Sequence, residues 1–208
     1  MAKVLTDMEW VGLAADPKST REFMTSIKRE PNAIVATDSY HLHFTEGEHG
    51  LEQGFIDAKT GVLKQDVHYP NWRQVVPVVA DATTLPYLDV NNAEPILKAA
   101  LAAYRAAGRT FYWVTLPTAD GRSVALNPEY VLDALAGCAR SLRSVPFQAP
   151  DPLKPVLFCV LGVIRQAVIM PVRMTTGFKS PRFDLTEFVK AHDGGAYPFP
   201  AYSGESNV

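Results

Sequence analysis

Short β-rich segments separated by turn signals run through most of the chain and limit it to a fold built from short strands. Segments 23–29, 33–36 and 111–116 are rich in β-branched and aromatic residues and lie between turn-forming Gly, Pro or Asn positions. The longest apolar run, 155–163, is about half the length of a membrane-spanning helix and is typical of a buried strand. The pattern predicts antiparallel sheets and no membrane span.

Three helices are predicted among these strands. The clearest covers 91–107, where Asn91 can cap the first turn and Gly108 ends the last. A second helix follows Asn127-Pro128, and a shorter one is expected within 6–15. Many short strands with about three helices predict an α+β fold.

Composition narrows the classes of function. The chain has 208 residues, 47% of them hydrophobic, and a net charge of −2, which fits one or two globular domains. Residues 71–174 are mildly basic, with 10 Lys+Arg against 7 Asp+Glu. The two cysteines, Cys138 and Cys159, stand in apolar settings and are expected to be reduced core residues of a cytoplasmic protein.

Asp38, His41 and His43 form the main candidate for catalytic chemistry. On a strand the two histidines share a face, so they could bind one metal ion and support a metal-dependent hydrolase. The alternative is that both line the wet face of a half-buried strand, with Leu42 and Phe44 pointing inward. No phosphate-binding loop, nucleophile elbow or H-E-x-x-H motif occurs. We therefore expect no enzyme, no metal and no cofactor.

A sparse basic stripe marks the helix predicted over 91–107. Lys98, Arg105 and Arg109 are spaced by seven and four residues and fall within roughly 40° of one another around a helix. Such a stripe could contact DNA phosphates without reading bases. Arg140 and Arg143, at the end of the next helix, could extend it or could simply complement a helix C-terminus. An ordinary solvated face is the other interpretation of the stripe.

Three short segments stand out: Ala-Thr-Asp-Ser-Tyr-His-Leu at 36–42, Tyr-Pro-Asn-Trp-Arg-Gln-Val-Val-Pro at 69–77 and Ile-Met-Pro-Val-Arg-Met at 169–174. Together they resemble motifs of bacterial sliding clamps, the β subunits of DNA polymerase III. Residues 36–42 (Ala-Thr-Asp-Ser-Tyr-His-Leu) are similar to the family's "ATDGHRL" segment. Residues 69–77 (Tyr-Pro-Asn-Trp-Arg-Gln-Val-Val-Pro) resemble its "(F/Y)PDYRRV(L/I)P" segment, and 169–174 (Ile-Met-Pro-Val-Arg-Met) resemble its closing "VMPMRL". Weaker similarities at 16–24, 126–135 and 151–156 fall in the family's order. The resemblance covers most of residues 10–174 and implies a DNA-clamp-like fold, with antiparallel sheets and a few helices on one face.

The sequence also departs from the family pattern. Family clamps have three similar domains, whereas this chain is far shorter and its stretch 37–69 has no room for the usual second helix. Ser39, Tyr40 and His41 stand where the family has Gly-His-Arg. We expect one clamp-like subdomain over 1–77, a second over 78–174, and a Gly/Pro-rich tail over 175–208.

The resemblance implies a peptide-binding pocket, because the three segments of a sliding clamp meet at the surface that receives the short motif of its partners. Carried over residue by residue, the pocket consists of Thr37, Ser39, Tyr40, His41, Leu42, Pro70, Gln74, Val75, Met170, Pro171, Val172 and Met174. Leu, Val, Pro and Met suit an adaptable apolar groove. The alternative is that these residues belong to the core.

Two functions follow from the resemblance. The first is a processivity factor that performs no chemistry and, as part of a homo-oligomeric ring, tethers a DNA polymerase to duplex DNA. The second is a clamp-fold adaptor that forms no ring and binds polymerase or clamp-loader peptides. Residues 184–191 predict a short helix in the tail, and its Leu185 and Phe188 could enter the pocket or pack on the body.

Overall fold

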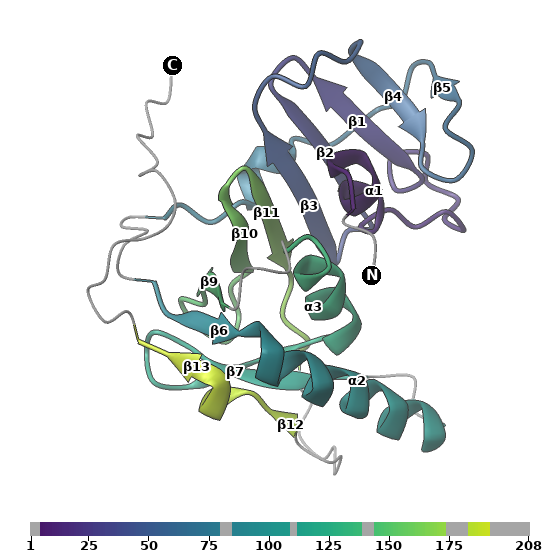
Figure 1. The fold of residues 1–208 in the computed structure, drawn as a ribbon. Helices are drawn as coiled ribbons and strands as arrows, with labels where there is room; N and C mark the ends of the chain where they lie inside the picture. The colour runs from purple at the N-terminus through teal and green to yellow at the C-terminus, as the bar shows by residue number, and fades with distance from the viewer. Residues whose placement is uncertain (1–4, 80–84, 109–111, 139–143, 174–182, 192–208) are drawn as a thin grey trace.

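The computed structural model describes residues 5–79, 85–108, 112–138, 144–173 and 183–191 (Figure 1). The strands of its ten-stranded sheet lie in the order β13-β6-β9-β10-β11-β3-β2-β1-β4-β5, and a smaller sheet has the order β12-β7-β8. All described strand pairs are antiparallel except β12 with β7, which is parallel. The predicted α+β class with antiparallel sheets is confirmed.

The elements have the following bounds. The strands of the large sheet are β1 (Ser26–Glu30), β2 (Ala33–Thr37), β3 (His41–Glu46), β4 (Gly54–Asp57), β5 (Leu63–Lys64), β6 (Tyr87–Asp89), β9 (Ser144–Gln148), β10 (Val156–Val163), β11 (Arg165–Ile169) and β13 (Val189–Lys190). The small sheet contains β7 (Val114–Pro117), β8 (Ser123–Leu126) and β12 (Phe183–Asp184). The helices are α1 (Asp7–Gly12), α2 (Val90–Ala106) and α3 (Pro128–Leu135), with 3-10 turns η1 (Trp72–Val75) and η3 (Thr186–Phe188). None of the described helices is long and apolar enough to cross a membrane.

Two similar units meet edge to edge in the large sheet. Each is a short helix followed by three consecutive antiparallel strands: α1 with β1, β2 and β3, and α3 with β9, β10 and β11. Their last strands, β3 and β11, pair antiparallel, with His41 opposite Ile169. The sheet therefore continues without a break across the predicted boundary at residue 77, and the division into two subdomains stays a prediction.

The two faces of this sheet carry different layers. On the inner face, residues such as Ile34, Phe158 and Ile169 share one core with the buried sides of the three helices. Figure 1 shows α1 and α3 lying against the strands of their own units, with α2 beyond α3. On the outer face, alternate residues such as Val35 and Val168 form a smaller core beneath segment 69–79. Alternation along each strand assigns neighbouring residues to opposite faces.

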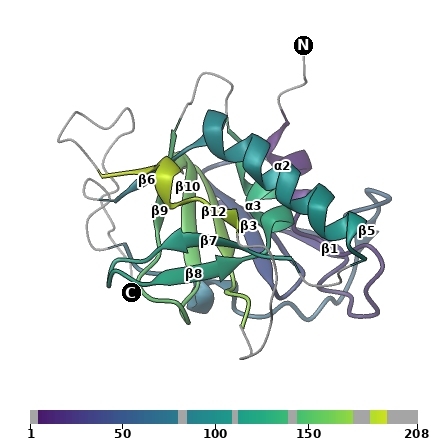
Figure 2. The same cartoon turned by 90° about the horizontal axis from the view of Figure 1, so that it is seen from below.

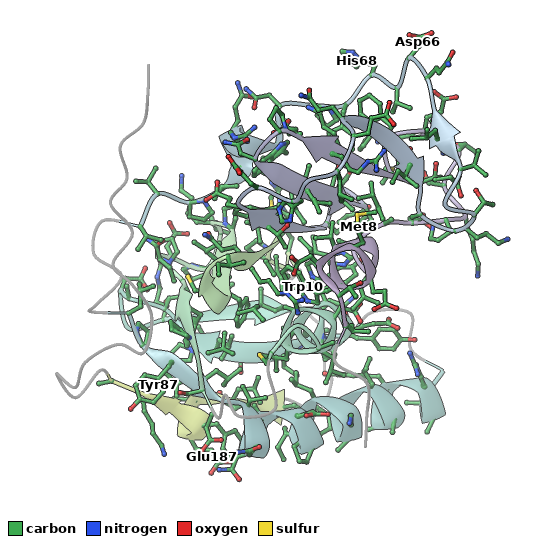
Figure 3. All side chains as sticks on the ribbon, turned by 45° about the horizontal axis from the view of Figure 1, so that its top comes forward. Met8, Trp10, Asp66, His68, Tyr87 and Glu187 are labelled. Atoms are coloured by element: carbon green, nitrogen blue, oxygen red, sulfur yellow. The ribbon has the colours of Figure 1, made fainter. Side chains whose placement is uncertain are left out.

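Trp10 and Arg165 join the two units on the inner face. The indole Nε1 of Trp10 donates to the carbonyl oxygens of Asp133 and Ala134 at 3.1 and 3.2 Å, which connects α1 to α3 (Figure 3). The buried guanidinium of Arg165 donates to Asp7 Oδ1 at 2.8 Å and to the Gly137 carbonyl at 3.0 Å. A buried cation with these partners stabilises one arrangement of the units, because removing a partner would leave it uncompensated.

Local sequence explains most element ends, with three corrections. Asp89, and not the expected Asn91, caps α2, because its carboxylate accepts the N–H groups of residues 91 and 92. Segment 75–79, whose valines are typical of a strand, is instead the end of η1 followed by irregular chain. The helix expected over 184–191 is replaced by η3 between β12 and β13, because sheet edges there offer backbone partners that a short helix would forgo.

Candidate functional site

The turn between β2 and β3 presents one exposed aromatic side chain. Asp38 Oδ1 accepts the N–H groups of Tyr40 and His41, both at 2.8 Å, and the Thr37 hydroxyl donates to the His41 carbonyl at 2.7 Å. These bonds hold Ser39 at a φ of 76°, which is uncommon for a residue other than glycine. The turn is thus well defined and leaves Tyr40 64% exposed.

The end of β11 lies directly beside this turn. The N–H of Met170 donates to the Tyr40 carbonyl at 2.8 Å, which extends the β3–β11 ladder by one step. Met170 is 38% exposed, whereas Pro171 and Val172 are half-buried. The N–H of Val172 donates to the Ala125 carbonyl in β8 at 2.8 Å, so the chain turns from the large sheet to the small one here.

Segment 69–79 crosses the outer face next to these residues. Its anchor is Trp72, which is 3% exposed and has its ring centroid 4.9 Å from that of Phe44. Val76 and Val79 pack on the same outer core. The side-chain amide of Gln148, at the end of β9, donates to the Val78 carbonyl at 3.3 Å. The three segments that resemble clamp motifs are therefore neighbours on one face.

Four exposed apolar side chains come from these segments. They are Tyr40, Val75, Val78 and Met170, and we call them the outer surface. Val78, which is 87% exposed, was not among the residues expected from the sequence. A regular strand would have turned Val76 and Val78 to one side, but the irregular backbone packs Val76 and Val79, both partly buried, against the outer core instead. Sequence patterning carried no signal for that change.

The other predicted pocket residues separate into three groups. Thr37, His41 and Leu42 are buried, whereas Ser39, Pro70 and Gln74 are exposed. Met174 lies outside the described residues. Leu42 belongs to the outer core and lies beneath the outer surface. Its burial agrees with the alternative given above, that some of these residues belong to the core. His41 points to the inner face, where its ring stacks on Tyr130 at 4.1 Å.

The histidine face of β3 is buried, so the expectation that it is wet is wrong. His43 is 0% exposed and stacks on Trp10 with ring centroids 4.5 Å apart, because α1 covers this part of the sheet. Its Nδ1 lies 3.0 Å from the Trp10 carbonyl oxygen. Burial lowers the pKa of His43 to about 3, and burial raises the pKa of Asp133 on α3 to about 6. Among the described residues, no three His, Cys, Asp or Glu side chains are arranged to hold a metal ion.

The predicted basic stripe meets carboxylates on the helices. The ammonium of Lys98 pairs with Glu94 one turn earlier, and the Arg105 guanidinium lies 3.1 Å from Glu129 of α3. Arg109, Arg140 and Arg143 lie outside the described residues. The Lys, Arg, Asp and Glu residues of α1, α2 and α3 are two cations, Lys98 and Arg105, and five acids, Asp7, Glu9, Glu94, Glu129 and Asp133.

Solved structures of bacterial sliding clamps have the same fold. The β sliding clamp of Caulobacter crescentus matches with a TM-score of 0.59 and 14% identity, over 81% of this chain and 63% of that chain. The clamp of Pseudomonas aeruginosa matches with a TM-score of 0.61 and 14% identity, over 80% of this chain and 64% of that chain. The DNA polymerase III β subunit of Thermotoga maritima matches with a TM-score of 0.56 and 16% identity, over 81% of this chain and 62% of that chain.

The chain therefore has the sliding-clamp fold and spans less than two thirds of the length of these clamps. The resemblance seen in short sequence segments is confirmed at the level of the fold. No protein-family model matches the chain, and comparison with curated proteins finds no match.

Proposed function

We propose that this chain is a sliding-clamp-like protein that binds the short peptide motif of a DNA polymerase or clamp loader at its outer surface. The observation that supports the proposal is the meeting of the three motif-like segments around Tyr40 and Met170. The protein would carry out no chemistry and would act in the cytoplasm, where its replication partners are. Its partner would be a peptide with a glutamine followed by leucines and a phenylalanine.

The outer surface has properties that suit such a peptide. Tyr40 offers a ring and a hydroxyl on a turn fixed by hydrogen bonds, so binding would order little of the protein. Met170 offers a flexible thioether that adapts to leucine or phenylalanine. The bonded backbone beneath both residues keeps their spacing constant. We expect a dissociation constant of roughly 1–100 μM, which is ordinary for a short linear motif on a small apolar surface.

Between the two clamp-like functions, the charges favour an adaptor over a DNA tether. Five acids against two cations on the described helices oppose contact with phosphates, and each cation already faces a carboxylate. Tethering to duplex DNA as part of a homo-oligomeric ring is the second candidate. It is favoured by the fold and by the position of all three helices on one sheet face.

Peptide titration by fluorescence anisotropy tests the proposal. Wild-type protein should bind the glutamine–leucine–phenylalanine peptide, and Met170→Ala or Tyr40→Ala should raise the dissociation constant about fivefold or more. Val62→Ala is the matched control, since Val62 is 62% exposed in the β4–β5 turn at the far end of the sheet. Pro70→Ala tests whether the surface extends along segment 69–79. Absence of binding at millimolar peptide would reject the proposed function and leave only the fold.

A further inference from the structure

Residues 183–190, which we call the edge strap, determine where the chain leaves the described structure. β12 pairs with β7 (Figure 2), and β13 pairs with β6, where Lys190 lies opposite Tyr87. Leu185 is 0% exposed in the inner core and Phe188 packs against that core, so both side chains lie on the body of the protein and are not available to the outer surface. The described residues end directly after Lys190.

The end of β13 lies at the same end of the large sheet as the outer surface. The strand register shows this, because β13 ends beside the start of β6, and the start of β6 lies beside the second half of β9. The end of β9 lies beside the start of β10, and the start of β10 lies beside the end of β11. Met170 follows β11, and Tyr40 precedes β3 at the same end.

The chain beyond residue 191 is long enough to reach the outer surface. Neighbouring strands lie about 4.8 Å apart, so along the sheet the end of β11 is about 19 Å from the end of β13, and the start of β3 is about 24 Å away. An extended chain spans about 3.3 Å per residue, so eight residues reach about 26 Å. Phe199, eight residues after 191, can therefore reach both Met170 and Tyr40.

The sequence beyond the edge strap suits an apolar surface. Residues 194–204, which lie outside the described residues, contain no Asp, Glu, Lys or Arg and include Tyr197, Phe199 and Tyr202. Tyr197 and Phe199 each precede a proline, which favours extended backbone at both, so docking would cost little conformational entropy. Aromatic rings offer a large contact area, and the thioether of Met170 makes favourable contacts with such rings.

We propose that residues 197–202 bind the outer surface of the same chain and compete there with the partner peptide. The inference rests on the proposed function, because it names a regulator of the same surface. The segment, Tyr-Pro-Phe-Pro-Ala-Tyr, lacks the glutamine and the leucines of the partner peptide and should bind more weakly when free. Its attachment to β13 offsets this weakness, because a short linker gives an effective concentration in the millimolar range.

Peptide titration of the full chain tests this inference. Tyr197→Ser with Phe199→Ser removes two aromatic anchors and should lower the dissociation constant of the glutamine–leucine–phenylalanine peptide about threefold or more, which corresponds to a segment that occupies the surface in about two thirds of the molecules. Ser203→Ala, just beyond the segment, is the matched control and should bind as wild type does. Equal affinities of the double variant and wild type would overturn the inference and leave the proposed function in place.

Hydrogen exchange without peptide separates failure of this inference from failure of the proposed function. Exchange at residues 39–42 and 169–172 should be faster in the double variant than in wild type, because the segment no longer covers them. If the peptide binds neither form, faster exchange there supports docking of the segment, and unchanged exchange rejects it. If the ratio of the two peptide affinities grows with protein concentration, the segment comes from a second copy and the proposal of docking within one chain is wrong.

Discussion

The two faces of the large sheet are covered in different ways. The inner face is closed by three helices whose buried side chains form one continuous core with the strands. The outer face is covered by segment 69–79, which has only one turn of 3-10 helix and leaves Tyr40, Val75, Val78 and Met170 exposed. The same strands contribute to both faces, because their side chains alternate.

The comparison separates residues that stabilise the fold from residues available to a partner. His41 and Tyr40 are neighbours in sequence, yet one is 4% and the other 64% exposed. Substitutions on the inner face should therefore change stability, and substitutions on the outer surface should change binding.

Trp10→Ala should give the largest loss of stability. It removes a fully buried indole, its two hydrogen bonds to α3 and its stacking on His43. Truncating a buried tryptophan typically lowers the free energy of unfolding by about 3–5 kcal/mol. Denaturant unfolding followed by circular dichroism measures the change. A loss below about 1 kcal/mol would mean that α1 does not join the two units.

Gly137→Ala should be the next most damaging change. A Cβ at this position would lie 2.5 Å from Nε1 of Trp10, whose ring is held by its own hydrogen bonds. Overpacking a site that cannot yield costs about 1–3 kcal/mol. Ala136→Gly, at the exposed neighbouring position, is the control for a change of backbone flexibility. Equal stability of Gly137→Ala and wild type would show that α3 can move away from α1.

His43→Gln should change how stability depends on pH. Because the folded pKa of about 3 lies below the unfolded value of 6.5, His43 stays neutral in the fold, and acidification from 6.5 towards 3 costs stability. Wild type should lose about 2 kcal/mol from this group between pH 6.5 and 5, and the variant should not. His68→Gln, on an exposed loop distant from Trp10 (Figure 3), is the matched control.

The raised pKa of Asp133 makes stability depend on pH in the direction opposite to that of His43. Its cost is fully present above about pH 6 and disappears as the pH falls towards 3.8. In wild type the two contributions largely offset each other between pH 6.5 and 4, so His43→Gln alone should make stability rise on acidification, and adding Asp133→Asn should bring the profile back close to that of wild type. An unchanged profile in His43→Gln would show that this histidine is not held neutral by the inner core.

Lys98→Gln with Arg105→Gln should have the smallest effect. Both cations are more than half exposed and paired, and such pairs contribute about 0–1 kcal/mol to stability. If the protein is an adaptor, retention on duplex DNA at low salt should be weak and should hardly change. A clear loss of retention, with a smaller salt slope, would favour the DNA tether instead.

Sequence patterns predicted the fold class, the helices α1, α2 and α3, and the clamp resemblance, because these depend on local periodicity, capping and short motifs. They predicted that segments 36–42, 69–77 and 169–174 would be neighbours only through the resemblance. They could not predict that the His41 side of β3 is buried, since α1 and α3 reach it from distant parts of the chain. The pairing of Arg105 with Glu129 likewise depends on how α2 packs on α3, which no local pattern encodes.

The central claim is that a partner peptide binds the outer face and not the helix-covered face. Hydrogen exchange of the full chain, with and without saturating glutamine–leucine–phenylalanine peptide, tests it most directly. Protection should increase at residues 39–42, 74–79 and 169–172 and should stay unchanged in α1 and α2, because the four exposed side chains of the outer surface lie on the first set of segments. Peptide-dependent protection confined to the helices, with none around Tyr40 and Met170, would contradict the account.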